Sequence, residues 1–218
     1  MKAERVLEVI HDTGIVAILR LPDLTDVVDL CRTLLESGIK ALEIPLTNPD
    51  ALSALRKVRA EISEFSIGRA VIGTGTVLTP EFARQSIEHG AQFVVTPITN
   101  LAVIDTCRKE SVPNFPGAFT PTEIYTAWEA GASAVKVFPA RSLGPNFIKD
   151  VREPLPNLRL MPTGGVNVDN IGQYLSSGAY AVGVGGNLMN KEYVAQKNWT
   201  AIHEQASAYV RAVKEARS

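Results

Sequence analysis

Short apolar runs alternate along this chain with longer stretches in which apolar residues recur at the period of a helix. The runs are rich in β-branched residues, which indicates strands buried in a parallel sheet, and the stretches between them indicate covering helices. Eight strands are predicted, at residues 15–19, 41–46, 70–73, 93–96, 112–115, 134–138, 158–161 and 179–184. Helices are predicted near residues 24–37, 49–62, 80–89, 100–110, 121–130, 145–152, 167–177 and 198–216, with one more near 2–12.

Residues at the predicted boundaries support this division. Thr79-Pro80 and Thr120-Pro121 each place a hydroxyl cap before a proline at the first position of a helix. Glycines stand where four of the helices are expected to end in the left-handed conformation. These glycines are Gly38, Gly90, Gly131 and Gly178, and a strand follows each of them within a few residues. The chain therefore consists of a strand–helix unit repeated eight times.

Eight parallel strands either close into a barrel or lie in an open, doubly wound sheet. The 218 residues show no linker and no break in composition, so we expect one domain over residues 1–218. An open sheet that binds a dinucleotide would carry a glycine-rich turn after its first strand, where residues 19–23 read Leu-Arg-Leu-Pro-Asp. The sequence thus predicts the α/β class, as a (β/α)8 TIM barrel with an extra N-terminal helix.

Composition excludes several classes of partner. A net charge of −1 with no long basic run gives no reason to expect binding of nucleic acid or of a membrane surface. We expect no signal peptide and no membrane span. Cys31 and Cys107 lack CxxC spacing and are expected to be buried free thiols, which fits a cytoplasmic protein. The three histidines are far apart in sequence, so no metal site is expected.

A lysine interrupts the sixth apolar strand, and a glutamate interrupts the second. Lys136 lies in Ala134-Val135-Lys136-Val137-Phe138, and Glu43 lies in Ala41-Leu42-Glu43-Ile44. Burial lowers the pKa of a lysine and leaves a neutral amine that can attack a carbonyl, and a nearby carboxylate can move protons. Two structural readings stay open: a lysine that extends to the strand end, or an ion pair that only stabilises the barrel.

Other unusual residues follow the predicted strands at the end where barrels carry their chemistry. Arg20 ends the first strand, Thr76 follows the third and Pro97 follows the fourth. The planar fork of Arg20 suits a substrate carboxylate, with help from the Thr76 hydroxyl. The alternative for Arg20 is an ordinary surface arginine.

Two glycine pairs follow the seventh and eighth strands. Glycine lets backbone N–H groups approach an anion closely, and barrels commonly hold phosphate at these two loops. The candidate phosphate-binding residues are Thr163, Gly164, Gly165, Gly185, Gly186 and Asn187. With Lys136, the residues predict a substrate that has a carbonyl, a carboxylate at one end and a phosphate at the other. An imine at the carbonyl would then let a neighbouring C–C bond break or form.

Four segments resemble the class I aldolases of 2-keto-3-deoxy-6-phosphogluconate (KDPG) and 4-hydroxy-2-oxoglutarate (KHG). They are Leu42-Glu43-Ile44-Pro45-Leu46-Thr47, Ile72-Gly73-Thr74-Gly75-Thr76-Val77, Val135-Lys136-Val137-Phe138-Pro139-Ala140 and Met161-Pro162-Thr163-Gly164-Gly165-Val166. The resemblance covers nearly the whole chain and implies a TIM barrel, a homotrimer and neither a metal nor an organic cofactor. It implies that Lys136 forms the Schiff base and that Glu43 is the general acid/base, acting through water. Arg20, Thr76 and Pro97 would line the pocket for the pyruvyl end, and the two glycine pairs would hold the phosphate.

This chain departs from the family pattern at two positions. Thr47 stands where some members carry arginine, and Asn187 stands where some carry serine. The Glu-Ile-Pro-Leu segment also resembles the relatives specific for 6-phosphogalactonate. The expected reaction is cleavage of KDPG to pyruvate and glyceraldehyde 3-phosphate, with KHG, cleaved to pyruvate and glyoxylate, as a second substrate. The alternatives are the galactonate-derived sugar acid, an isomerase or synthase in which Lys136 supplies only charge, and a non-catalytic barrel that binds a phosphorylated metabolite.

Overall fold

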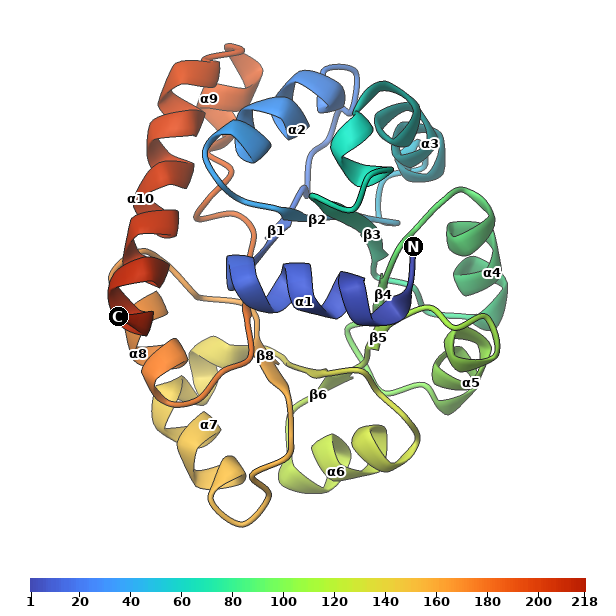
Figure 1. The fold of residues 1–218 in the computed structure, drawn as a ribbon, viewed down its shortest axis with the longest axis vertical. Coiled ribbons are helices and arrows are strands. Elements are labelled where there is room, and N and C mark those ends of the chain that lie inside the picture. Colours follow the sequence, from blue (N-terminus) through green and yellow to red (C-terminus); the bar gives the residue numbers. More distant parts are fainter.

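A computed structural model describes residues 1–218 and shows strands surrounded by helices (Figure 1). The strands are β1 (Ile15–Ile18), β2 (Ala41–Pro45), β3 (Val71–Gly75), β4 (Val94–Val95), β5 (Asn114–Phe115), β6 (Gly117–Ala118), β7 (Val135–Val137), β8 (Leu160–Pro162) and β9 (Val182–Val184). The helices are α1 (Ala3–Thr13), α2 (Val27–Glu36), α3 (Ala51–Glu61), α4 (Pro80–Glu88), α5 (Leu101–Lys109), α6 (Pro121–Glu129), α7 (Gly144–Arg152), α8 (Ile171–Ser176), α9 (Lys191–Ala195) and α10 (Trp199–Arg217), with 3-10 turns at Ser63–Phe65 and Ala140–Ser142.

The strands form two parallel sheets that together make the barrel. One sheet has the order β5-β4-β3-β2-β1-β9, and the other has the order β6-β7-β8. β5 and β6 are one barrel strand interrupted at Pro116, which has no N–H to give to a ladder. On the other side a bridge between Thr163 and Gly183 joins β8 to β9. The predicted (β/α)8 barrel with an N-terminal helix is confirmed.

Side chains alternate between the inside of the barrel and the layer under the helices. Ala41 and Ala134 belong to the inner cluster, whereas Leu42 and Val135 belong to the cluster that packs against the helices. Residues two positions further along each strand face the same way. The strand geometry therefore turns Glu43, two residues after Ala41, and Lys136, two residues after Ala134, into the barrel.

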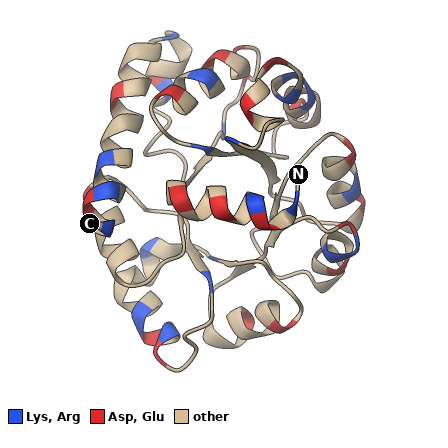
Figure 2. Cartoon of the chain, viewed as in Figure 1, with Lys and Arg blue, Asp and Glu red and all other residues tan.

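Helix α1 covers the amino-terminal end of the barrel (Figure 1). Its buried residues Val6, Val9 and Ile10 join the inner cluster, next to the strand-start residues Ala41 and Val71. Acidic residues gather on the rest of this helix, which faces solvent (Figure 2). Since one end of the barrel is covered, substrate can reach the interior from the carboxyl ends of the strands.

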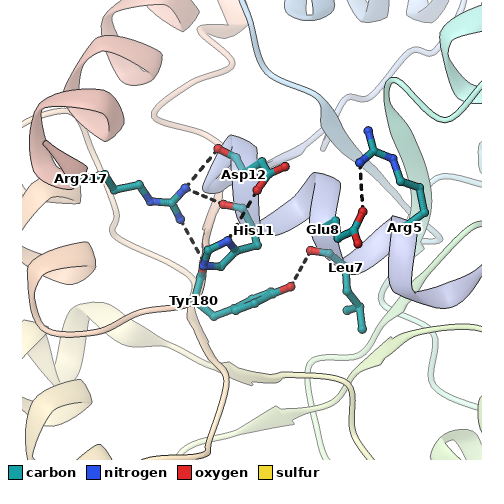
Figure 3. A network of polar contacts seen from close by, with 7 residues as sticks. All are labelled: Arg5, Leu7, Glu8, His11, Asp12, Tyr180 and Arg217. Atoms are coloured by element: carbon teal, nitrogen blue, oxygen red, sulfur yellow. Dashed lines mark hydrogen bonds and ion pairs between the residues drawn. The ribbon is translucent and has the colours of Figure 1, made fainter.

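The C-terminal helix holds α1 in place through Arg217 (Figure 3). The Arg217 guanidinium donates to the carbonyl oxygens of His11 (2.6 Å), Asp12 (3.1 Å) and Tyr180 (3.2 Å). The Tyr180 hydroxyl in turn donates to the carbonyl oxygen of Leu7 at 2.5 Å. One side chain near the end of the chain thus satisfies the last carbonyls of the first helix.

Replacing Arg217 with alanine is expected to lower the free energy of unfolding by about 1 to 2 kcal/mol, because three carbonyls lose a charged donor. Urea titration followed by circular dichroism measures this loss. The matched control is Arg84→Ala, whose ion pair with Glu81 lies on an exposed helix face, and which should leave the urea midpoint unchanged. Equal urea midpoints for Arg217→Ala and the control would contradict the conclusion that Arg217 holds α1 in place.

Several helix boundaries are confirmed, and others were wrong. Thr79 caps α4 by accepting from the backbone of Phe82, and Thr120 forms a capping box with Glu123 at the start of α6. The helix predicted from residue 24 begins at Val27, and the one predicted over 167–177 is limited to α8 (Ile171–Ser176).

The two late starts have the same physical reason, because polar side chains there bond the backbone into turns. Asp23 accepts from the backbone N–H of Thr25 at 2.8 Å. Asn167 and Asn170 exchange bonds between side chain and backbone at 2.8 and 3.0 Å. The short helix α9 was not predicted.

Cys31 and Cys107 are buried free thiols, as predicted. Burial raises the pKa of both thiols, that of Cys107 to about 12. None of the helices combines the length and the apolar character needed to cross a lipid bilayer.

Candidate active site

Glu43 and Lys136 lie inside the barrel on strands that do not pair with each other. β2 pairs with β1 and β3, and β7 pairs with β6 and β8, so the two side chains approach from different sides of the barrel. Glu43 is 2% exposed and Lys136 is 5% exposed. The Oε2 atom of Glu43 is buried and has no hydrogen-bond partner in the chain. A buried carboxyl oxygen without a partner is costly, which indicates that a ligand or water completes the site.

Burial pushes both groups toward their neutral forms. It lowers the pKa of Lys136, against the opposing effect of Glu43, and the positive charge of Arg20 lowers that pKa further. Burial also raises the pKa of the Glu43 carboxyl, while Lys136 and Arg20 oppose that shift. An amine that loses its proton easily is a nucleophile, and a carboxyl with a raised pKa can both take and return a proton.

Gly75 makes room for the carboxyl of Glu43. Gly75 is the β3 partner of Pro45 in the ladder between β2 and β3. A Cβ at position 75 would lie 1.7 Å from Oε1 and 2.5 Å from Cδ of Glu43, far inside contact distance. Only glycine lets the carboxyl occupy this place. The sequence signal was a glycine inside a buried strand, which often marks such a close approach.

Phe138 is a further candidate site residue that the sequence analysis did not assign. The Lys136 Nζ lies 5.0 Å from the centre of its ring, within range of a cation–π interaction. The ring would lie 3.3 Å from a Cβ at Gly164, so it is placed between the amine and the first glycine loop. Its position two residues after Lys136, on the same side of the strand, was the signal available.

Arg20, Thr76 and Pro97 all lie at the carboxyl-terminal end of the barrel, as predicted. Arg20 is exposed, and its charge acts on both buried groups. Thr76 and Pro97 are half-buried on the loops after β3 and β4. The Thr76 backbone has φ +56°, a conformation that a β-branched residue rarely adopts. Such strain persists where the surroundings impose it, and it is common at functional sites.

Replacing Thr76 with glycine is expected to raise the free energy of unfolding by about 1 kcal/mol while weakening the site. Glycine removes the strain of the left-handed backbone, but the hydroxyl is lost and the loop is freed. Urea titration and the KM for substrate measure the two effects. Thr76→Ser, which keeps the hydroxyl, should keep a KM close to the original. A glycine variant with unchanged KM would remove Thr76 from the site.

The two glycine loops lie side by side at the same end of the barrel. The Asn187 amide donates to the carbonyl oxygen of Val166 at 3.0 Å and so links the loops. Thr163 is buried, and its hydroxyl donates to the carbonyl oxygen of Met161 in β8. Its side chain therefore supports the glycine loop after β8 from inside the barrel. The structure therefore places Thr163 and Asn187 as residues that hold the loops together.

Four backbone N–H groups in these loops have no acceptor within the chain. They belong to Gly164, Gly165, Gly185 and Gly186. Gly164 and Gly165 have φ of +89° and +93°, and around Gly186 a Cβ would meet nothing within 4 Å. Unpaired N–H groups gathered in one concave turn form a site for an anion. Elsewhere, no group of three or more His, Cys, Asp or Glu side chains is placed to hold a metal ion.

Known proteins are similar to this chain over most of its length. The family model "KDPG and KHG aldolase" matches residues 6–205. The 2-dehydro-3-deoxy-phosphogluconate aldolase of Haemophilus influenzae is 34% identical over 91% of this chain and 92% of its own length. The 2-dehydro-3-deoxy-6-phosphogalactonate aldolase of Escherichia coli is 34% identical over 84% of this chain and 85% of its own.

Two solved structures are similar in fold. KDPG aldolase from Legionella pneumophila, with pyruvate captured as a covalent carbinolamine intermediate, has a TM-score of 0.83 at 27% identity, over 93% of this chain and 97% of its own. A designed cage made by fusing symmetric oligomeric domains has a TM-score of 0.84 at 31% identity, over 93% of this chain and 73% of its own. With the family match and the relatives at 34% identity, these likenesses show that the chain belongs to the KDPG and KHG aldolase family, whose members are lyases.

Proposed function

We propose that this chain is a class I aldolase that cleaves KDPG to pyruvate and glyceraldehyde 3-phosphate. The observation that carries the proposal is the buried Lys136, with its lowered pKa, in the same barrel as the unpartnered carboxyl of Glu43. The gluconate aldolase from Haemophilus influenzae supports the substrate, and the pyruvate adduct of the Legionella relative supports covalent chemistry.

The reaction begins with attack of the neutral Lys136 amine on the C2 carbonyl of the sugar acid. The resulting carbinolamine takes up a proton on its hydroxyl group and loses water to give an iminium ion. Glu43, through water, accepts the proton of the C4 hydroxyl, and the C3–C4 bond breaks as its electron pair moves into the iminium. Glyceraldehyde 3-phosphate leaves, the enamine is protonated at C3, and hydrolysis of the imine releases pyruvate and restores the lysine.

The other candidate residues hold the two ends of the substrate. Arg20 supplies a planar fork for the carboxylate, and Thr76 and Pro97 line the pyruvyl pocket. At the far end, the four unpaired backbone N–H groups donate hydrogen bonds to the phosphate, and Thr163 and Asn187 hold the two loops in place. Phe138 supports the positive charge of Lys136 and of its iminium ion.

The 6-phosphogalactonate-derived sugar acid is the second candidate substrate, because the galactonate relative is as similar as the gluconate one, at 34% identity. The two sugars differ in stereochemistry. KHG, which has no phosphate, is proposed as a third substrate. We also propose that the protein works in the cytoplasm as a homotrimer.

Borohydride trapping combined with substrate assays tests the proposal. Reduction in the presence of pyruvate should add the mass of reduced pyruvate to the peptide that contains Lys136, and Lys136→Ala should show no adduct. Pyruvate release from the two phospho-sugar acids and from KHG, measured side by side, should be fastest with KDPG. An isomerase or a binding-only barrel would give no adduct. An adduct with faster galactonate cleavage would keep the mechanism and change the substrate.

The rate of imine formation should rise with pH through the lowered pKa of Lys136. Only the neutral amine attacks, and burial moves its pKa below the ordinary value of 10.5. The ascending limb of the plot of imine-formation rate against pH therefore lies at lower pH than for a solvent-exposed lysine. Trapping of pyruvate with cyanoborohydride across pH measures this limb. Arg20→Gln removes a positive charge that lowers this pKa, so it should move the limb to higher pH. An ascending limb at the pH of an ordinary lysine would contradict the burial effect.

A further inference from the structure

The segment that carries Arg20 leaves the ladder of the sheet immediately after β1. The backbone N–H of Leu19 still donates to the carbonyl oxygen of Glu43 in β2 at 2.8 Å. Arg20 and Leu21 then donate to carbonyl oxygens only two residues back, those of Ile18 and Leu19, at 3.0 and 3.1 Å. Bonds of this span form tight turns of three residues. Arg20 is exposed between two buried leucines, so the position of its side chain depends on how this turn is held.

Asn48 joins the turn of Arg20 to the segment after β2. Its side-chain amide donates to the carbonyl oxygen of Leu21 at 3.2 Å and to that of Pro22 at 3.1 Å. No other group of the chain donates to either carbonyl. Pro22 has no N–H, so it cannot hold the turn with a donor bond of its own. The Asn48 amide is therefore the polar link between this turn and the segment that follows the strand of Glu43.

The other bonds of Asn48 fix the orientation of its amide. Its Oδ1 accepts from the backbone N–H of Asp50 at 2.9 Å, and its carbonyl oxygen accepts from the N–H of Ala51 at 3.1 Å, where α3 begins. The reverse orientation would point Oδ1 at two carbonyl oxygens and the NH2 group at an N–H. One side chain thus has two tasks: its oxygen forms the turn before α3, and its NH2 group holds the turn after β1.

Arg20 acts on both buried groups of the site from this turn. Ile18, two residues before Arg20, is the ladder partner of Glu43. The positive charge of Arg20 lowers the pKa of Lys136 and opposes the rise in the pKa of Glu43. A bidentate contact with a carboxylate needs the guanidinium in one position, whereas a free arginine side chain has many rotamers. A group that fixes the turn therefore lowers the entropic cost of binding the carboxylate.

We propose that Asn48 is a positioning residue, which holds the turn at Leu21 and Pro22 and so places Arg20 to receive the carboxylate of the substrate. This inference rests on the proposed function, which gives Arg20 that contact. The alternative is that Asn48 serves only the fold, as the residue that forms the turn before α3. The two roles differ in one measurable respect, because only a positioning residue has an effect that depends on Arg20.

Asn48→Ser separates the two tasks of this side chain. Serine keeps an oxygen that can accept from the N–H of Asp50, but it has no NH2 group for the carbonyls of Leu21 and Pro22. The pyruvate concentration that gives half-maximal borohydride trapping should rise about threefold to tenfold, the range for loss of one ordinary hydrogen bond. The trapping yield at saturating pyruvate should stay unchanged, because Lys136 is intact. The KM for KDPG should rise by a similar factor, with kcat close to its original value.

A double-mutant cycle with Arg20→Gln identifies the route of the effect. In the Arg20→Gln background, Asn48→Ser should cause no further rise in the half-saturating pyruvate concentration, because the side chain that it positions is already absent. The matched control is Asn198→Ser. Asn198 caps α10 by accepting from the N–H of Ala201 at 3.1 Å, a bond that serine can also make, and its amide holds no other segment. This control should leave pyruvate binding unchanged.

Each outcome of the cycle has a definite meaning. An unchanged half-saturating concentration in Asn48→Ser, an equal rise with and without Arg20, or an equal rise in Asn198→Ser would overturn the positioning role. If Arg20→Gln alone left pyruvate binding unchanged, the carboxylate contact of Arg20 would fall together with the positioning role. The adduct at Lys136 in the original chain would still support the Schiff-base mechanism in all these cases. Absence of that adduct would instead overturn the proposed function, and this inference with it.

Discussion

Replacing Lys136 with alanine is expected to reduce aldol cleavage by about four orders of magnitude or more. The covalent imine is the electron sink of the reaction, and no other amine lies buried beside Glu43 to replace it. Steady-state pyruvate release, coupled to lactate dehydrogenase, measures turnover, and borohydride trapping measures the adduct. Appreciable cleavage by Lys136→Ala would show that the mechanism is wrong.

The matched variant for this experiment is Lys136→Met. Methionine has a similar length and is apolar. Because burial lowers the pKa of Lys136 and raises that of Glu43, both groups are pushed toward their neutral forms, and the substitution removes a buried polar group without leaving an unpaired charge. We therefore expect the urea midpoint of Lys136→Met to equal or exceed that of the original chain, although its turnover is lost. Glu43 should also hold its proton to higher pH in this variant, because Lys136 opposes the rise of its pKa. Loss of activity together with retained stability separates chemistry from folding.

The sequence predicted that Glu43 and Lys136 are buried inside the barrel because strand geometry is local. Glu43 and Lys136 each interrupt an apolar strand, and the alternation of side chains turns both inward once the strands close. The glycine pairs after the last two strands were also visible. Tight turns use glycine routinely, so it was the occurrence of two pairs at the loops where barrels commonly hold phosphate that favoured an anion site. What the sequence could not supply was contact between strands that are far apart along the chain.

Gly75 and Phe138 show this limit. The close approach of Gly75 to Glu43 depends on the register between β2 and β3, and the place of the Phe138 ring depends on the loop after β8. A pattern within one segment can mark each residue, but it does not identify the residue that each one contacts. The break at Pro116 was missed for a related reason: the ladder changes from β4 to β7 there, and only the neighbouring strands reveal it.

Replacing Gly75 with alanine is expected to reduce turnover about 10²- to 10⁴-fold, the range that loss of a general acid/base gives. The new methyl group would lie 1.7 Å from Oε1 of Glu43, so the carboxyl must rotate away from its place. Trapping of pyruvate at Lys136 should survive, because the amine is on another strand. Turnover and trapping measured on the same preparation distinguish lost proton transfer from lost imine formation.

The control is Gly172→Ala, since a Cβ at position 172 meets only the Ala216 Cβ at an ordinary 3.7 Å. Alanine in helix α8 should raise the free energy of unfolding by about 0.5 to 1 kcal/mol and leave turnover unchanged.

A second test follows from the direction of the clash. Gly75→Ala should lower stability by about 1 to 3 kcal/mol through overpacking, and adding Glu43→Asp should restore much of it, because aspartate is one methylene shorter. The double variant should stay inactive, because a carboxyl that no longer reaches its place relieves the clash without restoring proton transfer. Full turnover by Gly75→Ala would mean that Glu43 acts from another position or does not act at all.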